Sequence, residues 1–150
     1  MTYPIQEAQY RQFLIQKGML FTQERATILK LVLTRTDHFS VDDLLFQVQK
    51  ENLNVSRATL YRNLKLLEQA GILVEADFGH GHTHYERAMG TPPHEHLVCS
   101  NCKAITEVRT SQLTDAVQKI AKSQGFSLDH YQLQIFGTCK NCQKKKASRH

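Results

Sequence analysis

Four cysteines, arranged as two Cys-x-x-Cys pairs, are the residues whose types and spacing point most directly to chemistry. The pairs are Cys99 with Cys102 and Cys139 with Cys142, and the chain contains no other cysteine. A gap of two residues lets both sulfurs of a pair bind one ion, and two pairs complete the tetrahedral shell of a structural zinc site. Because such a shell leaves no open coordination position, we expect the ion to stabilise the fold.

Disulfide bonds are the alternative use of these cysteines. Disulfides are typical of secreted proteins, and the segment MTYPIQEAQY has no basic region followed by an apolar core, as a secretion signal would. No apolar run approaches the roughly 18 residues that a membrane span needs. We therefore expect thiolates on Zn2+ in a cytoplasmic protein that has no membrane partner.

A second group of metal-binding residue types lies beside the first cysteine pair. His94 and His96 are two residues apart, so on a strand they point to the same face, and Glu107 lies on the next predicted strand. Nitrogen and oxygen ligands suit iron(II), manganese, nickel, cobalt or zinc. The alternative is that each histidine is an ordinary surface or core residue. That alternative is stronger for the loop FGHGHTH, which we expect to be solvated and which contains His80, His82 and His84.

The elements that must position these residues differ between the two halves of the chain. The first half has the apolar spacing, caps and terminal glycines of helices, followed by two strands around the FGHGH loop. The pattern of the second half predicts short strands around one amphipathic helix. The predicted helices are 5–17, one from Thr22, one from Ser40 and 56–71; the predicted strands are 72–77, 83–87, 94–99, 105–108 and 131–136, with a helix at 111–124.

The last helix of the first half has the features of a DNA recognition helix. Leu60, Leu64 and Leu67 share one face and predict a core contact, while basic residues gather near the start of the helix. Helices before it and a hairpin after it give the order of a winged helix-turn-helix. The alternative is an amphipathic helix with a solvated basic face. The residues predicted to contact DNA are Arg57, Thr59, Tyr61, Arg62 and Lys65.

The global charge adds little to this argument. The net charge is +5, but the chain up to Arg87 carries ten basic and ten acidic residues, and the remainder carries nine and four. The excess therefore lies in the cysteine-containing half, where four thiolates on one zinc ion would offset two positive charges. The DNA prediction depends on the local pattern of the recognition helix.

Four segments in this order resemble the Fur family of metal-dependent transcriptional repressors: the helix RATLYRNLKLLEQAGI, the strand ending in HYE, the block PHEHLVCSNCKAITEV and the final CKNC. The resemblance runs from about Phe13 to Cys142. It implies an α+β protein that binds palindromic, double-stranded operator DNA as a homodimer. Its parts would be a winged-helix domain at 1–87, a hinge at 88–93, an α/β dimerisation and metal-sensing domain at 94–142 and a basic tail at 143–150.

The resemblance also implies a regulatory metal site. An ion that takes ligands from both domains would favour the DNA-binding arrangement through its higher affinity for that arrangement. Iron(II) ranks first as the effector; peroxide sensing at bound iron, or a response to zinc, manganese or nickel, are alternatives within the family. The ligand positions that match are His38, Glu86, His94, His96 and Glu107.

Several positions depart from the family pattern. An auxiliary metal site of the family is matched by Glu95, but Pro93 and Tyr131 stand where histidines are common, and His130 lies one residue away. The nickel-sensing branch uses wing histidines, which keeps His80, His82 and His84 as auxiliary candidates. Leu20 replaces a lysine that enters the minor groove in many members, and Lys17 or Arg25 are the available substitutes.

The same residues could serve two other classes of function. A zinc-dependent hydrolase could use His94, His96 and Glu107 with a bound water, but the chain has neither a His-Glu-x-x-His helix motif nor a free cysteine nucleophile. The other class is a DNA- or RNA-binding zinc module that does not sense metal. We expect a regulator that is not an enzyme and has no small-molecule substrate.

Overall fold

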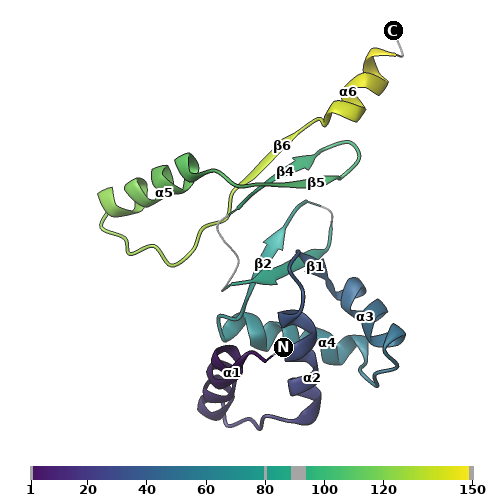
Figure 1. Cartoon of the computed structure of the whole chain (residues 1–150), viewed down its shortest axis with the longest axis vertical. Coiled ribbons are helices and arrows are strands. Elements are labelled where there is room, and N and C mark those ends of the chain that lie inside the picture. The colour runs from purple at the N-terminus through teal and green to yellow at the C-terminus, as the bar shows by residue number, and fades with distance from the viewer. Residues whose placement is uncertain (1, 80, 89–93, 149–150) are drawn as a thin grey trace. The chain divides into compact units, whose positions relative to one another are not determined.

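The computed structural model describes residues 2–79, 81–88 and 94–148, and the chain divides into two compact units, Met1–Thr91 and Pro92–His150 (Figure 1). The predicted hinge at 88–93 lies outside the described residues except for Ala88. No helix in the described part of the chain is both long and apolar enough to span a membrane.

Four helices form most of the first unit, and side-chain caps define three of their starts. Thr22 accepts a hydrogen bond from the backbone of Arg25, Ser56 accepts one from Thr59, and Ser40 forms a reciprocal capping box with Asp43. These caps satisfy backbone N–H groups that have no partner within the helix. The helices are α1 (Pro4–Gln16), α2 (Gln23–Leu33), α3 (Val41–Lys50) and α4 (Arg57–Gln69).

A three-stranded antiparallel sheet completes the first unit. Its order is β1 (Phe39–Ser40), β3 (Thr83–Arg87) and β2 (Leu73–Asp77), and β2 and β3 form the predicted hairpin. Gly71, at φ +72°, lets the chain turn from α4 into β2. The core between helices and sheet is apolar and includes Leu14, Ile28, Leu44, Leu60, Leu64 and Leu67, which are all fully buried. Helices followed by a hairpin confirm the predicted order of a winged helix-turn-helix.

The second unit is a small mixed sheet with two helices. The strand order is β5 (Ile105–Val108), β4 (Glu95–Cys99) and β6 (Gln134–Gly137); β4 runs antiparallel to β5 and parallel to β6. The helix α5 (Ser111–Ser123) connects β5 to β6, and α6 (Lys140–Ala147) ends the described chain. The mixture of helices and sheets in both units confirms the predicted α+β class.

The structure adds two elements that the sequence patterns did not predict. β1 has only two residues and pairs with β3 through Phe39 and Ser40, so it is too short to show an alternating pattern. The basic tail predicted at 143–150 is helical as far as Ala147, because α6 begins directly after Cys139 and lysine favours helix.

The second unit leaves much of its apolar surface exposed. Leu113, Val117 and Ile120 share one face of α5, but no residue of this helix is buried, and in Figure 1 the helix projects away from the three strands. Further large apolar side chains of the unit are exposed, namely Leu97, Phe126, Leu128, Ile135 and Phe136. Large exposed apolar patches are typical of interaction surfaces.

Candidate metal centres and DNA-binding surface

The basic face of α4 is the predicted DNA-binding surface, and its cations differ in their surroundings. Arg57 forms an ion pair with Asp42, and the Lys65 ammonium lies 2.6 Å from the carboxylate of Glu68 and 3.4 Å from that of Glu75. These carboxylates raise the pKa of Lys65. DNA phosphates would have to compete with existing ion pairs at both cations.

Arg62 is held differently from the other cations of α4. Its Nη2 donates to the Thr59 hydroxyl at 3.3 Å, and no ion pair of Arg62 is found among the described residues. Thr59 itself is buried and also accepts from the Ser56 hydroxyl, so its oxygen belongs to the helix cap. Tyr61 is 49% exposed. Of the predicted DNA contacts, Tyr61 and Arg62 are therefore the most available, whereas the Thr59 hydroxyl already bonds to Ser56 and Arg62.

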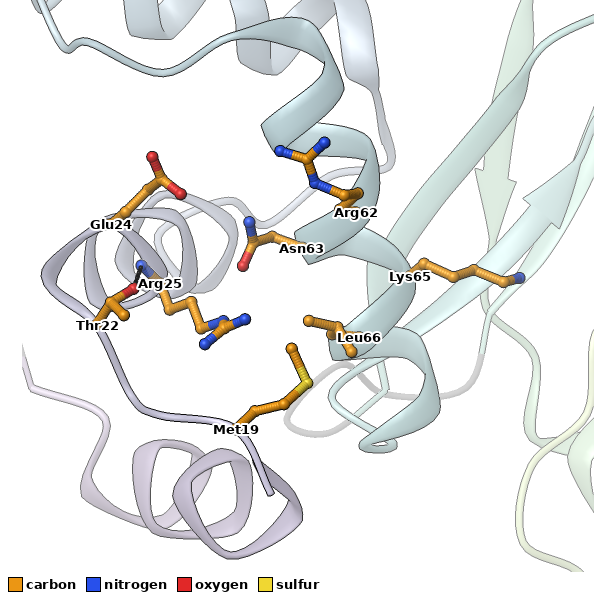
Figure 2. A pocket seen from close by; sticks show the side chains of 8 residues that line it. All are labelled: Met19, Thr22, Glu24, Arg25, Arg62, Asn63, Lys65 and Leu66. Atoms are coloured by element: carbon orange, nitrogen blue, oxygen red, sulfur yellow. Dashed lines mark hydrogen bonds between the residues drawn. The ribbon is translucent and has the colours of Figure 1, made fainter. Parts of the chain in front are cut away.

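A cavity of about 490 Å³ lies between the start of α2 and α4 (Figure 2). Figure 2 shows Arg25, Asn63 and Leu66 pointing into this space, and Arg62 and Lys65 also line it. Arg25 donates to the carbonyl of Leu20, which is itself exposed. The cavity places Arg25, a candidate substitute for the missing lysine, next to the recognition helix.

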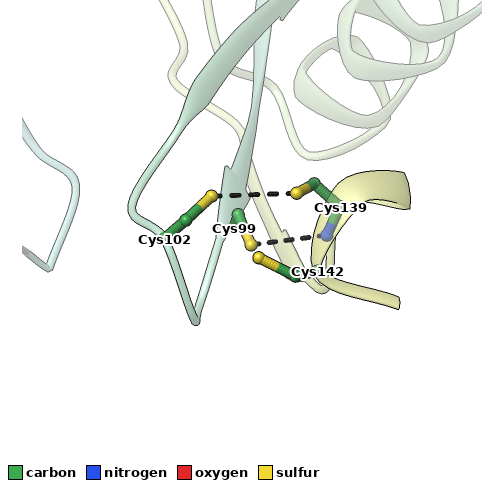
Figure 3. A group of neighbouring side chains, drawn as sticks. All are labelled: Cys99, Cys102, Cys139 and Cys142. Atoms are coloured by element: carbon green, nitrogen blue, oxygen red, sulfur yellow. Dashed lines mark hydrogen bonds between the residues drawn. The ribbon is translucent and has the colours of Figure 1, made fainter. Parts of the chain in front are cut away.

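The four cysteines come together in the second unit (Figure 3). Cys99 ends β4, Cys102 lies in the turn to β5, Cys139 precedes α6, and Cys142 is in its first turn. All four sulfurs lie within 4.8 Å of one another. The backbone N–H of Cys139 donates to the sulfur of Cys99 at 3.3 Å, a contact typical of a thiolate. The predicted four-sulfur cluster is therefore present and fits one tetrahedral zinc ion.

The protonation chemistry of the cluster also favours a cation. Backbone N–H groups of Cys102 and Cys139 lower the pKa of the Cys99 thiol to about 6. Hydrogen bonding to Cys139, together with burial, raises the pKa of Cys142 to about 12. Thiolates this close together repel one another, so some of the four sulfurs stay protonated. A divalent cation would offset the repulsion and let all four ionise.

The predicted ligands of the second unit lie together: His94 directly precedes β4, His96 is on β4 and Glu107 is on β5. His96 is paired directly with Glu107 in the β4–β5 register, and the ring centres of His94 and His96 are 4.7 Å apart. Nε2 of His94 lies 4.0 Å from Oε1 of Glu107. Two imidazoles and one carboxylate form an incomplete ligand set for a divalent transition metal.

The predicted ligands of the first unit lie at one end of its sheet. Phe39 pairs with Tyr85 and Ser40 with His84, so extending this register by one residue places His38 opposite Glu86. Both side chains are half-buried. The five predicted regulatory ligands thus form two groups, one in each unit.

The auxiliary metal candidates have mixed surroundings. The buried ring of His84 packs against His38 and Phe78, with ring centres 5.5 and 5.1 Å away, and His82 is exposed beside it at 4.9 Å. His84 is therefore part of the packing of the first unit. His130 is exposed, and His80 lies outside the described residues.

Glu95, the remaining auxiliary candidate, takes part in contacts that sequence patterns did not reveal. Its Oε1 accepts a 2.8 Å hydrogen bond from the hydroxyl of Tyr131, which also contacts Thr114. The partners lie 36 and 19 residues away along the chain, too far for a local pattern. The only available signal was the presence of a tyrosine where the family often has histidine.

Comparison with known proteins agrees with this geometry. Residues 16–136 match the Ferric uptake regulator family. The chain is 32% identical over 147 residues to the "Ferric uptake regulation protein" of Campylobacter jejuni, covering 97% of this chain and 93% of the relative. It is 29% identical over 131 residues to the "Peroxide operon regulator" of Bacillus subtilis, covering 87% and 89%.

A solved structure gives the same result. The ferric uptake regulator from Pseudomonas aeruginosa with manganese superimposes with a TM-score of 0.77 at 26% identity, covering 91% of this chain and 98% of the other. The family match spans most of the chain, and it confirms the resemblance carried by the recognition helix, the histidine block and the two cysteine pairs. This chain belongs to the Ferric uptake regulator family.

Proposed function

We propose that the protein is a metal-responsive transcriptional repressor that binds palindromic operator DNA as a homodimer when its regulatory site holds iron(II) or a similar divalent ion. The observation that carries this proposal is the division of the ligands. His38 and Glu86 belong to the DNA-binding unit, and His94, His96 and Glu107 to the other unit. An ion that takes ligands from both groups favours the DNA-binding arrangement because it binds that arrangement more tightly. The protein then acts in the cytoplasm as a regulator and not as an enzyme.

Iron(II) is the first choice of effector. Three imidazoles and two carboxylates suit iron(II), manganese(II), zinc(II) and nickel(II) alike, so ligand type does not decide between them. The relative from Campylobacter jejuni is named for ferric uptake, and the related structure from Pseudomonas aeruginosa contains manganese. Likeness to the peroxide operon regulator of Bacillus subtilis supports peroxide sensing at bound iron as the second candidate.

The proposal is tested by fluorescence anisotropy on promoter DNA at fixed salt. Protein that keeps its four-sulfur zinc but is otherwise demetallated is titrated anaerobically with iron(II), manganese(II), zinc(II) and nickel(II). We expect binding at a far lower concentration of one metal than of the others. DNA binding that is equally tight without added metal would contradict metal sensing. Peroxide added to the iron-loaded complex separates the two candidates, since only a peroxide sensor would release DNA with oxygen added to a ligand histidine.

The unburied apolar face of α5 supports the homodimer. A second copy of the chain would cover this face, together with the exposed apolar residues around it. Ile120, at 65% exposure, is the most exposed apolar side chain of the face. Burying it in an interface would contribute roughly 2 kcal/mol per copy.

Replacing Ile120 by lysine is therefore expected to shift the protein from dimer to monomer, because a charge would be buried at the interface. Sedimentation velocity across a range of concentrations measures the shift. Ile15→Lys is the matched control, since Ile15 is 75% exposed on α1 of the other unit. A dimer unaffected by the Ile120 change would place the interface elsewhere.

Replacing Arg62 by alanine is expected to weaken operator binding by about 1–3 kcal/mol if the guanidinium reads a base. Anisotropy with operator and scrambled DNA at several salt concentrations measures the effect. Lys50→Ala removes one positive charge from the end of α3, outside α4, and should change the affinity for either DNA little. An equal loss on both DNAs, with a shallower salt dependence, would show that Arg62 contacts only phosphate.

A further inference from the structure

A buried carboxylate lies between His94, which directly precedes β4, and His96 of β4. Glu95 is 1% exposed, and because side chains alternate along a strand it points to the opposite face from His94 and His96. Its Oε2 has no hydrogen-bond partner among the described residues. Burying a carboxylate is costly unless it is hydrogen-bonded. The bond to its other oxygen therefore has a large effect on where the side chain can lie.

That bond belongs to a chain of hydroxyl groups that reaches α5. The Tyr131 hydroxyl donates to Oε1 of Glu95 at 2.8 Å and lies 3.1 Å from the hydroxyl of Thr114, in the first turn of α5. Because the single phenol hydrogen is used for Glu95, the Thr114 hydroxyl donates to Tyr131 at 3.1 Å in preference to its other acceptor, the carbonyl of Thr110 at 3.4 Å. The three side chains come from the start of β4, the segment before β6 and α5.

The hydrogen-bond chain from Thr114 through Tyr131 to Glu95 meets β4 at its first residue. On the β6 side the backbone ladder reaches only as far as His96, whose N–H donates to the carbonyl of Leu133 at 3.1 Å. Glu95 is the first residue of β4, and on this side its contact with Tyr131 extends the attachment by one residue. The other side is held by the pairing of Glu95 with Val108. The hydroxyl of Tyr131 thus secures the strand end that carries His94.

We propose that Tyr131 is a positioning residue for the regulatory metal: held by Thr114, it fixes Glu95 and thereby the start of β4, so that His94 and His96 are held at the separation that one ion requires. This inference rests on the proposed function for the role of the two histidines. Residues that orient metal ligands typically change metal affinity by about 10–100-fold. Tyr131 acts on the ligands through the backbone of β4, so we expect the lower end of that range.

The test compares manganese(II) affinity in full-length, zinc-containing protein, measured by competition with a fluorescent chelator. Tyr131→Phe removes only the hydroxyl and is expected to weaken binding about 10-fold. The absorption bands of bound cobalt(II) should shift, because the ligand geometry changes. Zinc content and the thermal midpoint serve as checks on the fold. Affinity and cobalt bands matching those of the unmodified protein would overturn the proposal.

Two further variants separate positioning from other roles of these hydrogen-bonded residues. Thr114→Val should weaken metal binding by itself but add little in the Tyr131→Phe background, because its only other hydrogen bond among the described residues is a long 3.4 Å contact with the Thr110 carbonyl. Glu95→Gln keeps an oxygen that accepts from Tyr131 and should bind manganese nearly as tightly as the unmodified protein. A loss in Glu95→Gln as large as in Tyr131→Phe would contradict positioning, since it would show that the charge of Glu95 itself is required.

These outcomes are independent of the outcome for the proposed function. If the unmodified protein binds DNA without regard to metal, the repressor proposal fails, whatever the variants show. If the unmodified protein responds to metal but Tyr131→Phe responds identically, only the positioning role fails.

Discussion

Replacing His96 by alanine is expected to abolish metal-activated DNA binding while the dimer and the four-sulfur zinc persist. His96 is paired with Glu107 and lies against His94, so its loss leaves the second unit with two of its three proposed ligands. The metal concentration needed for DNA binding should rise by more than about 100-fold, beyond the effect expected for residues that only orient ligands. Anisotropy with added metal measures the change, and zinc content and sedimentation report on the fold.

His130→Ala is the matched control for this variant. His130 is an exposed histidine of the same unit; it is an auxiliary metal candidate but not one of the five proposed regulatory ligands. We expect it to respond to metal as the unmodified protein does. Loss of zinc, fold and dimer in His96→Ala would instead show that the histidine site is structural, and undiminished activation by metal would remove His96 from the sensor.

Replacing Cys99 by serine is expected to have the opposite pattern, with loss of zinc, of the folded second unit and of the dimer together. Among the described residues of this unit, the only buried apolar side chains are Val98 and Cys99. So small a core cannot replace a structural zinc site, whose binding contributes roughly 10–16 kcal/mol in small zinc domains. Zinc analysis, circular dichroism and sedimentation measure the three losses.

Ser100→Ala, one residue away, is the control for the cysteine variant. Ser100 is exposed, and the backbone N–H by which it bonds to Gly137 is unchanged by the substitution. This variant should keep one zinc ion per chain and remain dimeric. A Cys99→Ser protein that also kept zinc and dimer would contradict the structural role of the four-sulfur cluster.

Local patterns predicted the parts of the structure that depend on near neighbours. Ser40 and Asp43 form their capping box within four residues, and each Cys-x-x-Cys pair has zinc spacing within four. His94 and His96 needed only the alternation of a strand. Each of these features is determined by residues close together in the chain, which is why sequence reasoning could find them.

The features that sequence reasoning missed depend on contacts between distant segments. Asp42 pairs with Arg57 of the recognition helix, and Tyr131 reaches Glu95 across 36 residues. β1 is a strand only because β3 lies beside it. His38 is predicted as a ligand through the family resemblance alone, and the register that places it opposite Glu86 depends on that same short strand.

If one metal ion and operator DNA favour the same arrangement of the two units, their binding free energies must be coupled. If metal tightens DNA binding by some factor, DNA must tighten metal binding by the same factor. We would measure manganese(II) affinity with and without saturating operator DNA, using scrambled DNA as the control. We expect operator DNA to tighten metal binding by the factor found in the anisotropy titration. Metal affinity unchanged by operator DNA would show that metal binding and DNA binding are not coupled.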